Sequence, residues 1–135
     1  MGKYRIPSKN SEYYIPREDY LTAIHFSLRY PLWLEEIKGL EDTSAAIRYD
    51  RDKVQTSSDY DSTAEAAVRI AKIRDKVTLV EEVIRYVSHD MDYWIKLGVC
   101  YGLTFDQLKN KGMPCERDTY YLMRRHYYYE LCQRI

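Results

Sequence analysis

The chain has 135 residues, and its 21 Lys and Arg balance its 21 Asp and Glu, so the formal net charge is zero. This balance excludes a uniformly basic protein that coats nucleic acid, and any electrostatic binding surface must therefore be local. No apolar run approaches the roughly 18 residues that span a membrane, and the N-terminus, MGKYRIPSKN, lacks the apolar stretch of a signal peptide. We therefore expect a single-domain cytoplasmic protein.

The N-terminal third of the sequence predicts a polar arm and two short helices. Five Gly and four Pro, beside many Leu, Ile, Ala, Glu, Lys and Arg, favour an all-α fold. Residues 1–15 are polar and predict an arm, and Pro16 suits the first position of a helix. Tyr30-Pro31 should end or kink that helix. A second helix is expected over 32–40, with Trp33 and Ile37 in contact with the core.

Residues 41–61 have no clear periodicity and predict an irregular loop. Loops of this length often carry function, but a solvated connector is the alternative. The arm, the two short helices and this loop make a first segment, 1–61. The remainder, 62–135, should contain a long helix and a C-terminal helical unit, and we expect both segments to form one compact domain.

The clearest helical pattern starts at Ser62, where Ser62 and Glu65 have the spacing of a capping box. Apolar residues then recur every three or four positions, at Ala66, Ile70, Ile73, Val77, Val80, Ile84 and Val87. This pattern predicts a long central helix over 62–87. Its apolar seam fits either the core of an intramolecular bundle or a homodimer that pairs two seams as a coiled coil.

The C-terminal third predicts three helices joined by tight turns. Ser88-His89-Asp90 should break the long helix, and a helix over 91–101 should end at Gly102. Thr104 and Gln107 form a second capping box, which opens a short helix over 104–111. Gly112 and an apolar Met113 then precede the last helix. This order favours a helix-turn-helix, although a corner of a plain helical bundle can have the same caps and glycine turns.

Helical geometry divides the Tyr-rich last helix into faces. One face is expected to meet the core: Tyr120, Met123, Tyr127 and Leu131. A neighbouring strip is expected to stay accessible: Arg117, Tyr121, Arg125 and Tyr128, with Arg124 at its border. Tyr129 and Leu122 should lie opposite the core. Guanidinium and phenol groups on such a strip can bind phosphate, or they can belong to a packed amphipathic helix with snorkelling arginines.

Two functions follow from this strip. The first is sequence-selective binding of double-stranded DNA, and its expected contact residues are Lys109, Lys111, Arg117, Thr119, Tyr121, Arg124 and Arg125. Arg117 and Thr119 would reach base edges, and Arg125 with the lysines would meet phosphates. The second is a protein-interaction module, because Tyr and Arg are enriched at protein hot spots.

No pattern indicates an enzyme, a cofactor or a metal. Cys100, Cys115 and Cys132 match no zinc spacing, and the three histidines are equally scattered. No phosphate-binding glycine loop or catalytic motif occurs. We therefore expect a non-enzymatic protein without a catalytic, cofactor or metal site.

The C-terminal stretches GLTFDQL, MPC and TYYLMRRHYYYEL resemble a known family. They look like small phage and prophage transcriptional regulators of the RinA/ArpU type, whose C-terminal end is similar to region 4 of sigma factors. The resemblance implies a DNA-binding helix-turn-helix with Gly102, Thr104, Gln107 and Leu108 in its first half and 113–125 in its second. It also implies a bacterial host cell, where the alternative becomes a phage inhibitor of a defence protein, such as an anti-CRISPR, or an assembly factor.

Overall fold

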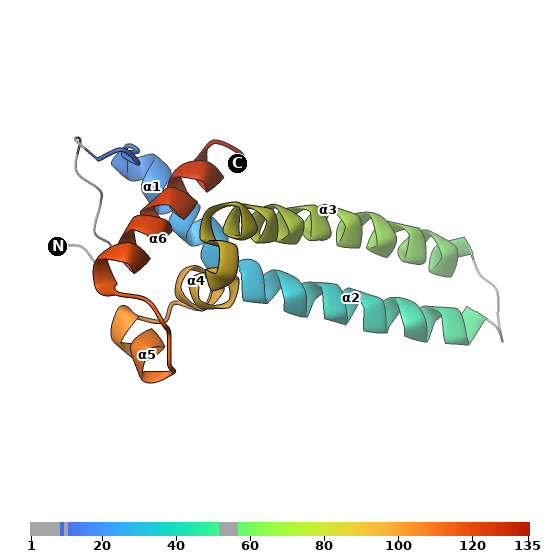
Figure 1. Ribbon diagram of the computed structural model, residues 1–135. Helices are drawn as coiled ribbons and strands as arrows, with labels where there is room; N and C mark the ends of the chain where they lie inside the picture. Colours follow the sequence, from blue (N-terminus) through green and yellow to red (C-terminus); the bar gives the residue numbers. More distant parts are fainter. Residues whose placement is uncertain (1–8, 10, 52–56) are drawn as a thin grey trace. The chain divides into compact units, whose positions relative to one another are not determined.

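The protein is all-α (Figure 1). A computed structural model describes the backbone of residues 9, 11–51 and 57–135, and the side chains of 9, 11–43 and 63–135. Its elements are α1 (Arg17–Leu28), α2 (Tyr30–Arg51), α3 (Ser57–Ser88), a 3-10 turn (His89–Met91), α4 (Asp92–Val99), α5 (Phe105–Asn110) and α6 (Arg117–Cys132). The prediction of a small helical bundle with a long central helix is confirmed.

The chain forms two compact units whose bounds differ from the expected division at residue 61. The first unit joins Met1–Tyr30 to Val80–Ile135, and the second is the continuous segment Pro31–Leu79. The sequence order hides this arrangement, because the first unit is assembled from both ends of the chain. Residues in the middle of α3 are therefore the boundary, although no local signal marks them.

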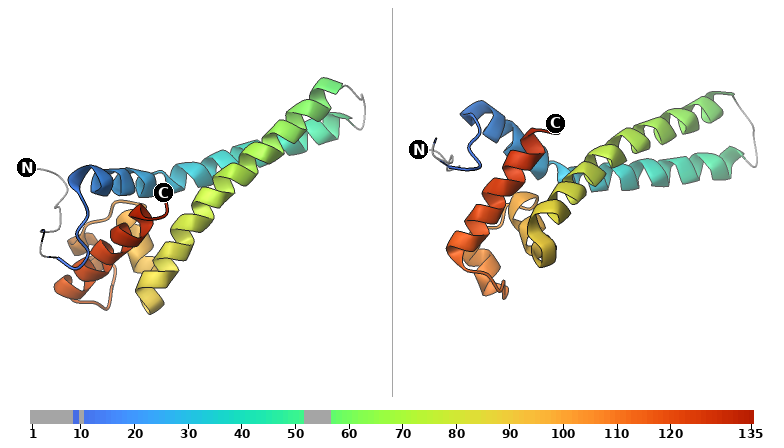
Figure 2. Two further views of the ribbon diagram at one scale, coloured as in Figure 1. Left: turned by 90° about the horizontal axis from the view of Figure 1, so that it is seen from above. Right: turned by 45° about the horizontal axis from the view of Figure 1, so that its top comes forward.

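The second unit is a hairpin in which α2 and α3 run side by side in opposite directions (Figures 1 and 2). Apolar side chains from both helices are buried, and they are Trp33, Ile37, Ile73 and Val77. The Lys76 ammonium lies 5.8 Å from the centre of the Trp33 ring. Arg69 donates to the Glu36 carboxylate at 2.7 Å, and Arg74 forms an ion pair with Glu41. Burial and paired charges together hold the two helices.

The prediction of a loop over 41–61 is wrong for most of that segment. The helix α2 continues through Arg51, and α3 already begins at Ser57. Ser62 consequently lies inside α3 and does not cap it. The prediction failed because the polar residues of this segment lack the periodicity of a buried face, although a helix can continue without such a face. Residues 52–56 of the segment lie outside the described residues.

The apolar seam of α3 is buried within the chain over most of its length. Ile73, Val77, Val80, Ile84 and Val87 are buried, whereas Ala66 and Ile70 are half-buried. The prediction of a long helix over 62–87 is confirmed inside the longer α3. The part of the seam from Ile73 to Val87 is therefore covered by the chain itself, and a homodimer through the seam stays a prediction.

The first unit builds its core from α1, α4, α5, α6 and the end of α3. The break expected near Tyr30 occurs at Arg29, which ends α1. The break after Ser88 is also confirmed, since His89 has a φ of 47° that no helix continues. Tyr30 then fixes the start of α2, because its hydroxyl donates to the Glu81 carboxylate at 2.5 Å. Burial and this neighbouring carboxylate both raise the pKa of Tyr30.

Candidate functional site

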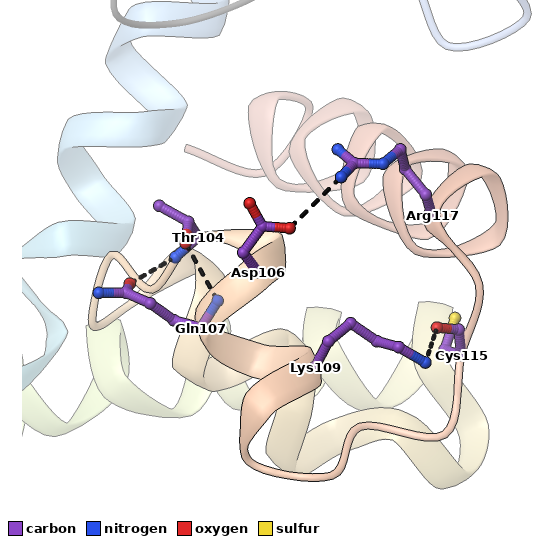
Figure 3. A network of polar contacts seen from close by, with 6 residues as sticks. All are labelled: Thr104, Asp106, Gln107, Lys109, Cys115 and Arg117. Atoms are coloured by element: carbon purple, nitrogen blue, oxygen red, sulfur yellow. Dashed lines mark hydrogen bonds and ion pairs between the residues drawn. The ribbon is translucent and has the colours of Figure 1, made fainter.

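The first half of the expected helix-turn-helix is formed as its sequence predicts. Gly102 has a φ of 73°, which lets the chain turn after α4. The Gln107 backbone N–H donates to the Thr104 hydroxyl at 3.2 Å, and the Thr104 N–H donates to the Gln107 side chain at 2.8 Å (Figure 3). This reciprocal capping box satisfies two free N–H groups at the start of α5. The short helix is thereby held at a defined starting residue.

The turn between α5 and α6 is closed by a Schellman motif. Gly112 has a φ of 103°, its N–H donates to the Lys109 carbonyl at 3.0 Å, and the Met113 N–H donates to the Leu108 carbonyl at 3.1 Å. Met113 is buried, as expected of an apolar residue that pins the two helices. The conformation of Gly112 and the burial of Met113 together fix the turn between α5 and α6. The helix-turn-helix-like end therefore has a defined local geometry.

The helix α6 is held by a tyrosine-rich face. Tyr120, Tyr127 and Leu131 are buried, which confirms three of the four expected core positions, and Met123 is half-buried. The hydroxyls of Tyr127 and Ser27 lie 2.8 Å apart in a buried hydrogen bond between α6 and α1. These contacts orient α6 along its whole length.

The prediction that Tyr128 is accessible is wrong, because Tyr128 is only 2% exposed. Its ring meets the Tyr20 ring of α1 edge-on, with the centroids 5.2 Å apart. The helix α1 packs against α6. It covers the Tyr128 edge of the strip that the sequence predicted to be accessible. A helical wheel of α6 alone cannot show this, since it carries no information about a second covering helix.

Two of the expected contact residues are held by the protein itself. The Lys109 ammonium donates to the Met113 carbonyl at 3.2 Å. It also donates to the Cys115 carbonyl at 3.2 Å (Figure 3), and so braces the turn. The Arg117 guanidinium lies 3.4 Å from the Asp106 carboxylate and 4.6 Å from the centre of the Phe105 ring. Both side chains link α5 to the start of α6, and both remain partly accessible.

The Arg124 side chain lies among aromatic rings. Its guanidinium carbon is 5.9 Å from the centre of the Tyr121 ring and 5.7 Å from that of Tyr128. Tyr121 itself is half-buried and has its ring 6.1 Å from Phe105. The predicted strip is therefore a partly closed, aromatic surface and not a row of free cations.

Three further expected contact residues are accessible, as Lys109 and Arg117 are. Lys111 and Thr119 are exposed and Arg125 is half-exposed. Leu122 is exposed as expected, at 49%, and continues the accessible face of α6. Lys111 and Thr119 sit at the turn and the start of α6, and Arg125 lies farther along that helix. A partner that meets the turn and the first three turns of α6 can therefore contact all three.

The accessible end of the helix pair carries both signs of charge. The acids Asp106, Glu116 and Asp118 are exposed beside Lys111 and Arg117. An acid near the start of α6 also stabilises the helix through its dipole. The surface is therefore mixed, and any binding of phosphate has to come from individual placed cations.

The sequence did not reveal that the N-terminal segment packs on α6. The Tyr13 ring stacks on the His126 ring at a centroid distance of 4.4 Å, and it lies 5.6 Å from the Tyr129 ring. Tyr129 is consequently half-buried, although the wheel placed it far from the core. The many Tyr residues near both ends of the chain indicated aromatic packing. No feature of the sequence indicated that the two ends contact each other.

The thiols and imidazoles do not gather into a metal site among the described residues. Cys100 is buried, and burial raises the pKa of its thiol to about 12. Burial also raises the pKa of Cys115 and Cys132. These thiols are therefore protonated near neutral pH and react slowly as nucleophiles.

Compared with protein-family models, with curated proteins and with solved structures, the chain matches none. Within the described part of the chain, no helix is long and apolar enough to cross a membrane. The α5–turn–α6 unit, with its accessible face from Lys111 to Arg125, is consequently the candidate site on its geometry alone.

Proposed function

We propose that the protein is a non-enzymatic DNA-binding regulator of the phage type, which acts in a bacterial cytoplasm and meets duplex DNA with α6. The observation that carries this proposal is the turn of the helix pair, with its capping box, Schellman motif and buried Met113. A helix pair with a fixed turn can place the start of its second helix in a major groove. In such a complex, Thr119 would reach base edges, and Lys111 and Arg125 would meet phosphates.

Replacement of Arg125 tests the phosphate role. In a gel-shift titration, Arg125→Ala should weaken binding to all duplexes by a similar factor. It should also reduce the slope of log affinity against log salt by about 1, as expected for one lost phosphate contact. Arg85→Ala is the matched control, since Arg85 is an exposed arginine on α3 and its loss changes the net charge equally. Wild-type protein that binds no duplex at low salt would reject the proposal.

A second candidate is a protein-interaction module, such as a phage inhibitor of a host defence protein or an assembly factor. The mixed charge around Asp106, Glu116 and Asp118 favours it, because repelling acids weaken phosphate binding but suit a protein partner. A pull-down from bacterial lysate treated with nuclease separates the two functions. Partners should survive the nuclease if this candidate is correct, and partners that disappear would exclude it.

A further inference from the structure

Among the residues that the structure describes, no carboxylate pairs with the Arg124 guanidinium. The side chain is half-buried, and its Nε is buried without a hydrogen-bond partner. The charged and polar groups that act on it most strongly are Tyr128, Tyr120 and Tyr20, and no carboxylate is among them. A cation that is withdrawn from water and not paired with an anion destabilises the fold.

The other arginines of the described chain make the contrast clear. Those with an ion pair are exposed, and they are Arg17, Arg69, Arg74, Arg117 and Arg134. The arginines that form an ion pair are thus exposed, whereas the half-buried Arg124 and Arg125 form none among the described residues. Of these two, Arg124 also has a buried Nε without a hydrogen-bond partner.

The surroundings of Arg124 fix the position of its charge. The Tyr121 and Tyr128 rings both lie within cation–π distance of the guanidinium carbon, at 5.9 and 5.7 Å. Tyr128 is fully enclosed and meets the Tyr20 ring of α1, so this side of the cage is rigid. Burial opposes the charge, but the phenol oxygens of Tyr128, Tyr120 and Tyr20 outweigh it and raise the pKa of Arg124. The group therefore stays cationic.

We propose that Arg124, held between Tyr121 and Tyr128, is a preformed anion site that takes one phosphodiester group of bound DNA. A planar guanidinium can donate two parallel hydrogen bonds to phosphate oxygens. An anion at this position supplies a negative charge for the Arg124 guanidinium, and the half-buried Tyr121 beside it can donate a further hydrogen bond. The identification of the anion as a phosphodiester of DNA rests on the proposed DNA-binding function. The anion site itself does not depend on that function.

The test compares stability with inorganic phosphate and affinity for duplex DNA in Arg124→Met. Phosphate should raise the Tm of the wild type in a concentration-dependent manner, as any ligand of the native state does, and should leave the Tm of Arg124→Met unchanged. Without phosphate, Arg124→Met should be at least as stable as the wild type, because an apolar chain of similar size replaces an unpaired charge. Its affinity for duplex should fall about tenfold, as for loss of a charged hydrogen-bonded pair.

Two further variants define the chemistry. Arg124→Lys keeps the charge without the planar fork, and should retain only a small part of the phosphate effect. Arg134→Met is the control, since it removes an exposed arginine that already pairs with Glu130 at 2.9 Å. The response of this control to phosphate should equal that of the wild type.

Several outcomes would overturn the inference. If Arg124→Met is less stable than the wild type in phosphate-free buffer, Arg124 is a structural cation of the tyrosine cage. If phosphate affects the wild type and Arg124→Met equally, the anion binds elsewhere. An acidic peptide that stabilises the wild type more than phosphate does would contradict the assignment to a phosphodiester. A wild type that responds to phosphate through Arg124 but binds no duplex would leave the anion site standing and reject the proposed DNA-binding function.

Discussion

Gly98→Ala is expected to destabilise the first unit by about 3 kcal/mol, the range of a severe overpacking defect. Gly98 lies in α4, and a Cβ at this position would stand 2.0 Å from the Tyr120 hydroxyl oxygen. Tyr120 is 1% exposed, so its ring cannot swing aside into solvent. The measurement is the free energy of unfolding from urea denaturation, followed by circular dichroism.

The sign of this effect separates packing from helix propensity. Alanine is favoured over glycine inside a helix by about 1 kcal/mol, so propensity alone predicts a more stable variant. Gly39→Ala is the control, because Gly39 is a helical glycine of α2 with no atom within 4 Å of the added Cβ. That variant should gain stability. Gly98→Ala that also gains stability would show that α4 and α6 do not approach closely.

A second substitution tests the cause of the Gly98→Ala defect. Tyr120→Phe removes only the hydroxyl oxygen, and the next ring atom is 3.3 Å from the added Cβ. The hydroxyl has no hydrogen-bond partner in the described structure, so its loss should itself have little effect. Gly98→Ala combined with Tyr120→Phe should therefore recover most of the stability lost in Gly98→Ala alone. A double variant as unstable as Gly98→Ala would place the clash elsewhere.

Leu108→Ala is expected to reduce the free energy of unfolding by about 2–5 kcal/mol, as for a leucine deleted from a packed core. Leu108 is 0% exposed in α5, and its carbonyl also accepts the N–H of Met113 in the turn. The cavity would therefore lie beneath the turn that joins α5 to α6. Thermal or urea unfolding measures the effect.

The same substitution at an exposed position is the control for this prediction. Leu122 is 49% exposed on the accessible face of α6, so Leu122→Ala should change stability by no more than about 0.5 kcal/mol. If the two variants lose similar stability, the assignment of buried and accessible faces on the helix pair is incorrect. If only Leu108→Ala loses stability, the result supports the assignment of Leu122 to the accessible face of α6, on which the proposed function depends.

The local features of the C-terminal end were predictable because each depends on neighbours in the sequence. Thr104 and Gln107 cap a helix across three residues, and Gly112 provides a backbone conformation that other residues resist. The burial of Tyr120 follows from helical spacing, and that of Met113 from its place in the turn. The resemblance to phage regulators and the preference for DNA stay predictions, since they concern a partner and not the fold.

The candidate site itself could not be read from spacing alone. Arg124 and Tyr128 were assigned to a strip beside the core, yet their environment is made by Tyr20, which lies more than a hundred positions earlier. Arg117 and Lys109 looked like free cations until the turn brought Asp106 and two carbonyls to them. A wheel of one helix shows which residues share a face, but not which faces other helices cover.

The sequence by itself determined where helices start and stop at the C-terminal end, because caps and glycine turns act over a few residues. It failed between 41 and 61, where a polar composition concealed the continuous helices α2 and α3. The tertiary structure alone decided that α1 closes over α6 and leaves Arg124 caged by tyrosines without an acid. Contacts between distant segments depend on the surfaces of both segments. A pattern within one segment therefore cannot predict them.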